Sequence, residues 1–173
     1  MFSKKFTLEK LRLMIALVIV WAGPGPYAVA VAADKVKETP SQMLYVTEGT
    51  FDEVKENIDL AITDQGLVIN NIATVGDMLE STGKDLGATR QVYVHGDVFE
   101  FCSATLSREM LEADQFNLVY CPYTIQVFEI PEQPGRIYVG YRRPDITGSE
   151  ASRMALQKVE ALLDTIVNEA LSW

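Results

Sequence analysis

The segment from 51 to 65 constrains the fold most strongly, because it carries both the end signals and the periodicity of a helix. Thr50 and Glu53 stand three residues apart, the spacing at which each side chain bonds a free amide of the first turn. Gly66 supplies the left-handed residue that ends the helix. Between these ends, apolar side chains recur at helical spacing, at Phe51, Val54, Ile58, Ala61 and Ile62. This one-sided stripe predicts a helix that packs onto another apolar layer.

Runs of β-branched and aromatic residues predict strands around this helix. We expect them at 42–47, 67–72, 90–101, 123–130 and 136–142. The last two flank a short loop rich in Pro and Gly, which indicates a hairpin. Apolar stripes predict further helices, a short one between 74 and 83, one from 103 to 113 and a long one from about 150 to 171.

The start of the helix at 103–113 has an alternative. Asp97 and Glu100 also have capping-box spacing, and Phe99, Cys102 and Leu106 extend the apolar stripe, so the helix can begin there. Otherwise Gly96-Asp97 interrupts the segment 90–101 as a bulge or as a turn between two strands. Periodicity does not distinguish the two starts.

The predicted order is β-α-β-(α)-β-α-β-β-α. This order indicates an α+β fold, a single domain in which a mostly antiparallel sheet has helices packed on it. We assign this domain to residues 42–173. The polar residues 34–41, which end near Pro40, are interpreted as a linker.

The first 33 residues have the three zones of a secretory signal peptide. Four Lys or Arg residues come first, an apolar run follows at 13–21, and small residues close the segment before Asp34. The apolar run is shorter than the roughly 20 residues that a bilayer span needs. The sequence therefore predicts a signal peptide at 1–33, cleaved after Ala32 or Ala33, and a periplasmic or secreted protein.

Removal of this segment leaves a strongly acidic chain. The full sequence has 15 Lys and Arg against 24 Asp and Glu, and 1–33 contains four of the bases and one of the acids, Glu9. The remainder therefore has a net charge of about −12, which repels nucleic-acid phosphates and anionic lipid. We expect no nucleic-acid or membrane partner after cleavage, and instead an unknown small molecule or protein.

Two segments that contain the cysteines carry a resemblance to a known family. Phe101-Cys102-Ser103 leads a short helix that ends near Met110. Cys121-Pro122-Tyr123 opens a strand that leads into the hairpin and the strand from Arg136. In this order and spacing, together with the helix at 51–65, they resemble the domain of unknown function 302 (DUF302) family.

The resemblance covers roughly 42–144 and has two departures. The family usually has proline before its second cysteine, where this chain has Cys121-Pro122, and Asn-Pro after the first, where this chain has Ser103-Ala104. These differences suggest a divergent, exported branch. The resemblance implies a compact α+β domain, with a homodimer as a candidate assembly, and it implies no established activity.

Familiar catalytic motifs are missing from the sequence. There is no Gly-rich phosphate loop, no His-Glu-x-x-His, no Cys-x-x-Cys and no Gly-x-Ser-x-Gly. His95 is the single histidine, so one chain cannot supply two imidazoles to a site. These features argue against classical hydrolases and zinc enzymes. We expect a binding or accessory protein rather than an enzyme, and no cofactor.

Cys102 and Cys121 form the candidate site, and three interpretations of them stay open beside that of two inert cysteines. In an oxidising compartment they are expected to form a structural disulfide around a loop of roughly 20 residues. Alternatively Cys102, just before a helix N-terminus, is a reactive thiolate and the catalytic residue of a redox enzyme or sulfur carrier. In the third, His95 and Met110 join both cysteines in a copper site.

Arg142 and Tyr123 complete the candidate binding residues. Arg142-Arg143-Pro144 is the one basic cluster beyond the signal peptide, and a guanidinium there can hold a carboxylate, a sulfate or a partner. Five tyrosines can line a pocket, although strands also carry tyrosine for packing: Tyr93, Tyr120, Tyr123, Tyr138 and Tyr141.

Overall fold

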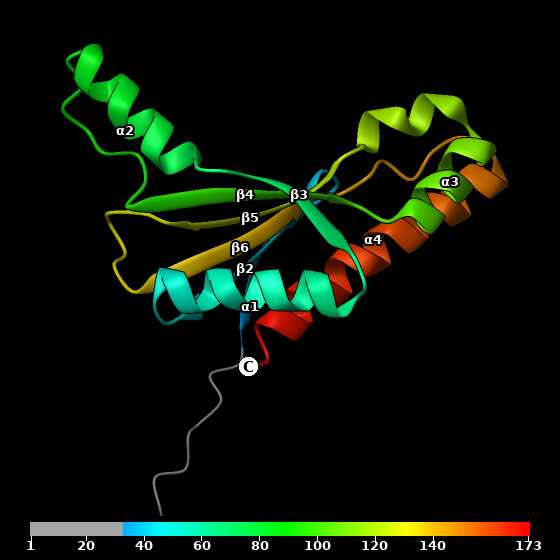
Figure 1. The fold of residues 1–173 in the computed structure, drawn as a ribbon, viewed down its shortest axis with the longest axis horizontal. Helices are drawn as coiled ribbons and strands as arrows, with labels where there is room; N and C mark the ends of the chain where they lie inside the picture. The colour runs from blue at the N-terminus through cyan, green and yellow to red at the C-terminus, as the bar shows by residue number, and fades with distance from the viewer. Residues whose placement is uncertain (1–32) are drawn as a thin grey trace, which may run out of the picture.

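The computed structural model of the protein describes residues 33–173 (Figure 1). The predicted signal peptide lies outside the described residues, except for Ala33. No helix in the described part of the chain is long and apolar enough to span a bilayer. The described residues form six strands, β1 (Asp34–Thr39), β2 (Gln42–Glu48), β3 (Val68–Ala73), β4 (His95–Cys102), β5 (Tyr123–Glu129) and β6 (Arg136–Arg142). The helices are α1 (Phe51–Asp64), α2 (Val75–Asp85), α3 (Ala104–Ala113) and α4 (Glu150–Ala170), with a 3-10 helix η1 (Gln115–Tyr120).

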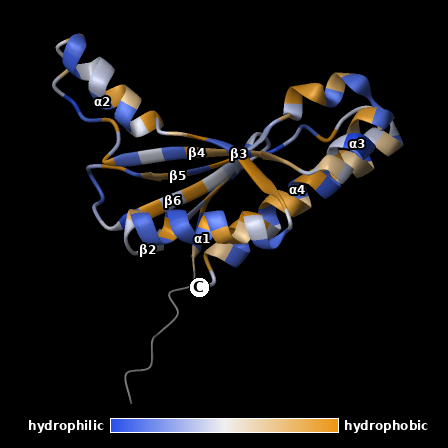
Figure 2. Cartoon of the chain, in the orientation of Figure 1, coloured by the Kyte–Doolittle hydropathy of each residue, from blue (hydrophilic) through white to orange (hydrophobic). Residues whose placement is uncertain are grey.

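The six strands make one antiparallel sheet in the order β1-β2-β6-β5-β4-β3. The predicted α+β fold, with helices packed on a mostly antiparallel sheet, is therefore confirmed. Helices α1 and α4 contact each other and lie along one face of the sheet (Figure 1). Both alternate hydrophobic and hydrophilic residues along their length, as expected of helices that bury one stripe (Figure 2).

The segment 34–41, interpreted from the sequence as a linker, is instead mostly strand. Its residues 34–39 form β1, which pairs antiparallel with β2. The strand is almost wholly exposed, so it shows none of the apolar alternation by which strands are recognised. Backbone hydrogen bonds to β2 hold it, and its charged side chains suit an edge strand that must not pair with other chains.

The structure of α1 confirms the helix predicted from the sequence. The Thr50 Oγ1 accepts the backbone N–H of Glu53 at 3.3 Å, and the Thr50 N–H donates to the Glu53 carboxylate at 3.2 Å. Gly66 has a φ of +71°, the left-handed conformation expected after the helix. The buried residues of α1 are the five of the predicted stripe.

The alternative helix start at Asp97 is wrong. Strand β4 continues through Gly96 and Asp97 to Cys102, and Ser103 caps α3, with its Oγ accepting the N–H of Leu106 at 3.4 Å. The strand is favoured because its side chains alternate, with Phe99 and Phe101 completely buried and Val98 and Glu100 half-buried. A strand therefore places the apolar side chains on one face and the half-buried ones on the other, whereas a helix would mix them.

The sheet buries one face completely and leaves the other partly open. The helix-covered face contributes fully buried side chains from β4, β5 and β6, namely Phe99, Phe101, Ile125, Val127, Ile137 and Val139. These pack with α1 and α4 into one apolar cluster. The alternate residues of β4 and β5 point to the opposite face and are half-buried. We call this second face the open face.

Helix α2 projects from one end of the sheet and touches it closely at Gly76 (Figure 1). Gly76 is the buried residue of α2, and a Cβ added there would lie 2.8 Å from the backbone nitrogen of Gly96 in β4. The helix extends past Gly83, which was expected to end it. A residue without a side chain is therefore what allows α2 to rest on the strand.

The substitution Gly76→Ala is expected to destabilise the protein by about 1–3 kcal/mol, because the new methyl forces backbone to move away from backbone. Denaturant titration measures the loss, and amide hydrogen exchange should show it concentrated in α2. Gly83→Ala is the matched control in the same helix, since its Cβ would meet only the Ala88 Cβ at 3.6 Å. Equal stability of the two variants would contradict the close α2–β4 contact.

Candidate functional site

The two cysteines meet where β4 ends and β5 begins. The antiparallel register places Phe101 opposite Tyr123, so the flanking Cys102 and Cys121 come together across the strand pair. They approach within 4.3 Å and remain two free thiols, each partly exposed. The expected structural disulfide is therefore not present. The close approach arises because η1 returns the chain from the end of α3 to the start of β5.

Two hydroxyl groups lie beside the cysteines. The Cys121 thiol is 3.7 Å from the Ser107 Oγ, to which it can donate, and that Oγ shares a hydrogen bond with the Tyr123 hydroxyl at 3.1 Å. Tyr123 is only 2% exposed, and burial raises its pKa to about 12. Tyr123 thus remains a neutral hydroxyl beside the thiols.

The surroundings of Cys102 argue against the expected reactive thiolate. Burial raises the pKa of the Cys102 thiol, and the neighbouring Cys121 raises it further. The backbone N–H of Tyr123 lowers this pKa only in part. Ser103 occupies the cap of α3, so Cys102 lies one residue outside the helix and does not receive its first free amides.

The proposed copper ligands are not brought together. His95 begins β4 and Cys102 ends it, a separation of about 23 Å at roughly 3.3 Å per residue. His95 instead stacks on Phe51 with ring centroids 4.7 Å apart. Met110 is completely buried on α3. Within residues 33–173 there is no group of three or more His, Cys, Asp or Glu side chains placed to hold a metal ion.

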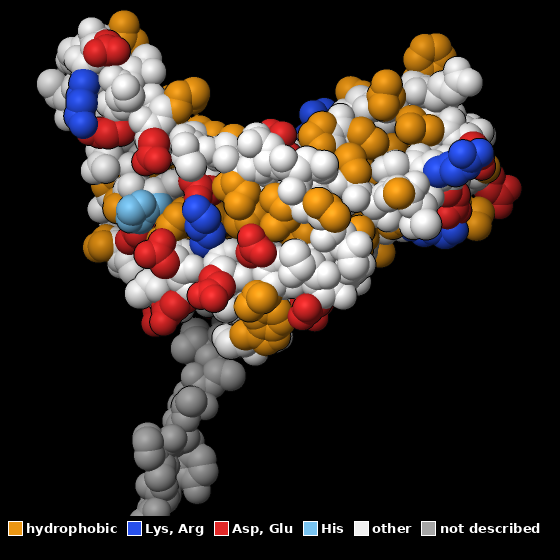
Figure 3. All heavy atoms as spheres, in the orientation of Figure 1, with side chains coloured by type: hydrophobic (Ala, Val, Ile, Leu, Met, Phe, Trp, Pro, Cys, Tyr) orange, Lys and Arg blue, Asp and Glu red, His pale blue; other side chains and the backbone are white. Residues whose placement is uncertain are grey.

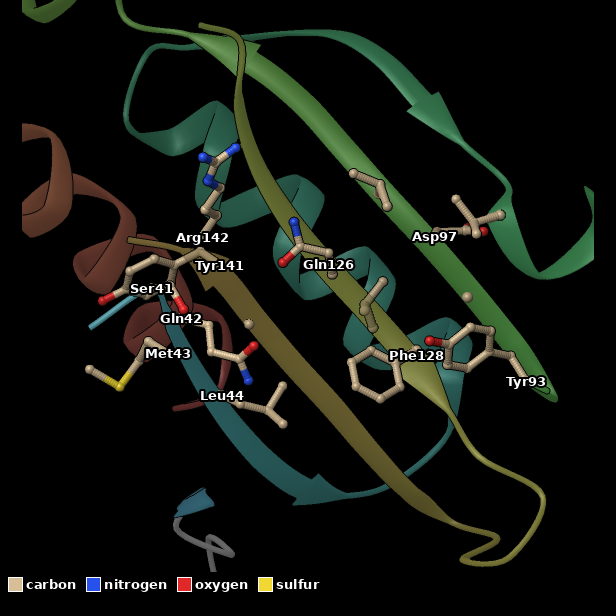
Figure 4. A pocket seen from close by; sticks show the side chains of 15 residues that line it. Ser41, Gln42, Met43, Leu44, Tyr93, Asp97, Gln126, Phe128, Tyr141 and Arg142 are labelled. Atoms are coloured by element: carbon tan, nitrogen blue, oxygen red, sulfur yellow. The ribbon is translucent and has the colours of Figure 1, made fainter. Parts of the chain in front are cut away.

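Arg142 is at the end of β6 and lines two cavities. A small cavity of about 120 Å³ brings it together with Tyr123, beside Pro122. A larger hollow of about 530 Å³ covers the open face from β2 to β4 and reaches the start of α2 (Figure 4). Side chains at this hollow include Gln42, Leu44, Tyr93, Val98, Gln126, Phe128 and Arg142.

Among the residues of this hollow, the sequence identified Arg142 as a candidate binding residue and included Tyr93 and Tyr141 among the tyrosines that can line a pocket. The others lie on four separate segments, and only the register of β2, β6, β5 and β4 sets them side by side. One signal was present in the sequence. The alternate residues Thr124, Gln126 and Phe128 of β5 are mixed in polarity, while those between them are uniformly apolar, which marks the less buried face of a strand.

Comparisons with known proteins identify the domain. The family model described as "Domain of unknown function DUF302" matches residues 44–170. Among solved structures, the "uncharacterized conserved protein DUF302 from Bacillus stearothermophilus" is similar, with a TM-score of 0.61 and 14% sequence identity. That match covers 73% of this chain and 97% of the other, and at this identity it shows a shared fold. No curated protein matches the sequence.

Proposed function

The chain belongs to the DUF302 family, and on this basis we propose that it is an exported accessory protein whose Cys102–Cys121 pair switches between two thiols and a disulfide. The observation that carries the proposal is the 4.3 Å approach of the two free cysteines across the ends of β4 and β5. The three zones of the segment 1–33 support export to the periplasm or the medium. Such compartments favour oxidation of a thiol pair.

Formation of the Cys102–Cys121 disulfide requires little movement of the chain. Cys102 ends β4 and Cys121 lies between η1 and β5, and both are partly exposed, so their side chains can rotate toward each other without breaking the sheet. In the reaction with a small disulfide, a cysteine thiolate attacks one sulfur and forms a mixed disulfide, releasing one thiol. The second cysteine then attacks the protein sulfur and releases the other thiol. Overall the pair loses two protons and two electrons, and one small disulfide becomes two thiols.

The electrostatics of Cys102 favour a redox pair over the alternative of an enzyme or sulfur carrier that uses Cys102 as its nucleophile. Fast nucleophilic cysteines have lowered pKa values, whereas the pKa of Cys102 is raised by burial and by Cys121. A smaller thiolate fraction at neutral pH slows attack on a disulfide. We therefore expect a pair that equilibrates with its surroundings and does not turn over substrates rapidly.

Equilibration of the purified protein in mixtures of reduced and oxidised glutathione tests this proposal. Alkylation followed by mass spectrometry should count two free thiols under reducing conditions and none under oxidising conditions, with a loss of two mass units for the internal disulfide. The Cys121→Ser control should form only a glutathione adduct at Cys102. A wild-type protein that takes up two glutathiones and forms no internal disulfide would sink the proposal.

The rate of alkylation separates the redox pair from the enzyme alternative. At neutral pH, Cys102 in the Cys121→Ser variant is expected to react with iodoacetamide more slowly than an unstructured cysteine peptide, because burial is the main cause of its raised pKa. A reaction faster than that of the peptide would instead favour a catalytic Cys102.

A further inference from the structure

We propose that the hollow on the open face of the sheet binds a small monocarboxylic acid with an apolar, preferably aromatic, body (Figure 4). This site is separate from the cysteine pair and its argument does not depend on the proposed redox function. The hollow measures about 530 Å³, within the roughly 300–1,000 Å³ of typical small-molecule sites. Three features argue for this ligand class: a gradient of polarity, an aromatic wall and an unpaired cation.

The gradient follows from the register of four strands. Side chains opposite one another on the open face form three rows across the sheet, Gln42–Arg142–Thr124, Leu44–Gly140–Gln126–Val98 and Val46–Tyr138–Phe128. The first row is polar, with the cation of Arg142 toward β2 and Glu100 at its far end beyond Thr124. The second row is mixed and the third is apolar or aromatic. Gly140 has no side chain in the middle row, and the Leu44 side chain lies close over it, since a Cβ on Gly140 would be 2.9 Å from the Leu44 Cδ1. A ligand that matches the rows has one polar end and one apolar end.

The apolar end is built from aromatic rings. Phe128 stacks on Tyr138 with centroids 5.2 Å apart and planes at 12°, and the Tyr93 ring meets Phe128 edge-on at 5.5 Å. The Tyr138 hydroxyl donates to the Gln133 side chain at 2.6 Å, which fixes this ring. Phe128 and Tyr93 are half-buried and still present apolar surface to water. An aromatic ligand would remove that surface from water and add stacking contacts.

The polar end is set by Arg142. No carboxylate lies within ion-pairing distance of Arg142 among residues 33–173, whereas its neighbour Arg143 pairs with Glu160 and Glu38. The planar guanidinium of an arginine matches a carboxylate with two parallel hydrogen bonds. A free arginine is notable here because the chain carries a net charge of −9. Acidic side chains gather instead over α1, on the covered side of the sheet (Figure 3).

The remaining charges of the open face limit the ligand to one carboxylate. Asp97 lies at the hollow, but it is in phase with Phe99 and Phe101, and its carboxylate pairs on the helix-covered face with Lys55 of α1 at 2.6 Å. Glu100 stands two strands from Arg142, beyond Thr124 in the same row, about 10 Å away at roughly 4.8 Å per strand. This distance is too long for an ion pair, yet short enough to repel a second negative charge on the ligand. A monoanion therefore fits better than a dianion.

Titration calorimetry with 2-naphthoate as the probe, and with the neutral 2-naphthamide as its matched analogue, tests the proposal. Wild-type protein is expected to bind 2-naphthoate saturably at millimolar concentration and to bind the amide about tenfold more weakly, because the charge-assisted hydrogen bonds are lost. Arg142→Gln should weaken the binding of 2-naphthoate by about tenfold or more and leave the affinity for the amide unchanged. Tyr93→Ala should weaken both compounds.

Arg136→Gln is the matched control, because Arg136 is an exposed arginine on the same strand and face, beyond the aromatic row. It should leave both affinities unchanged, and circular dichroism should show that all variants are folded. Absence of saturable binding, equal binding of acid and amide, or equal losses in Arg142→Gln and Arg136→Gln would each overturn the proposal. The 2,6-naphthalenedicarboxylate dianion should bind more weakly than 2-naphthoate, and tighter binding would overturn the monoanion preference.

Discussion

The substitution Phe99→Ala is expected to lower the free energy of unfolding by about 3–5 kcal/mol. Phe99 lies in the middle of β4 on the helix-covered face and has no exposed surface. Its ring belongs to the apolar cluster formed by the sheet with α1 and α4. Removal of the ring leaves a cavity that a closely packed sheet and two helices cannot fill, so the loss exceeds the transfer free energy of the ring alone. Denaturant titration of the purified variant measures it.

Phe128→Ala is the control for this effect. Phe128 has the same side chain on the neighbouring strand β5, but it points to the open face and is half-buried. We expect a loss of about 1–2 kcal/mol, from partial burial and from the stack with Tyr138. A loss at Phe128 as large as that at Phe99 would mean that something covers the open face, in conflict with the one-sided core.

How much of this fold the sequence predicts depends on whether a signal is local. Helix α1 is predicted to within a residue because its cap, stripe and terminating Gly66 all lie within one segment. Strand β1 is missed because its charged residues are stabilised by backbone pairing with β2, which leaves no trace in its composition. The start of α3 is ambiguous for a related reason, since Asp97 and Ser103 both offer caps and only pairing with β5 keeps 97–102 extended.

The same difference between local and non-local signals applies to the candidate site. The sequence identifies Cys102, Cys121 and Arg142 by residue type, but their neighbours are set by non-local pairing. The copper hypothesis fails at His95 because β4 is one continuous strand and not a hairpin that would fold its ends together. Arg142 and Arg143 are equivalent in the sequence, and the structure separates them, since strand alternation directs one to the hollow and the other to Glu160.

Alkaline pH is expected to destabilise the protein strongly, because two buried tyrosines hold their protons more tightly in the folded chain. Burial is the main cause that raises the pKa of Tyr45 from 10.0 to about 12. Its hydrogen bond to the Asp164 carboxylate, at 2.6 Å, contributes to the same rise. Burial also raises the pKa of Tyr123 to about 12. Tyr141, which donates to the same Asp164 at 3.1 Å, has a pKa raised in the same direction by burial.

The direction of this pH dependence follows from the number of protons that the folded and unfolded chains bind. Below pH 10 both the folded and unfolded chains keep these phenolic protons, so the stabilisation is fully present. Between about pH 10 and 12 the unfolded chain releases them while the folded chain retains them, and the free energy of unfolding falls by about 1.4 kcal/mol per pH unit for each tyrosine. For Tyr45 and Tyr123 together the loss by pH 12 is on the order of 5 kcal/mol, comparable to the whole stability of a small domain.

Urea titrations at a series of pH values from 8 to about 11.5 measure this dependence. The double variant Tyr45→Phe and Tyr123→Phe lacks both ionisable hydroxyls. Its free energy of unfolding should therefore fall less steeply with pH, with a slope that corresponds to about two fewer protons released on unfolding. The two rings stay in the core, and the variant is therefore expected to remain folded near neutral pH, with a modest loss from the missing hydrogen bonds to Asp164 and Ser107. A slope unchanged from that of the wild-type protein would show that deprotonation of other groups, such as the lysines, controls alkaline unfolding. The comparison therefore separates Tyr45 and Tyr123 from Tyr141 and from the general increase in negative charge, which both proteins share.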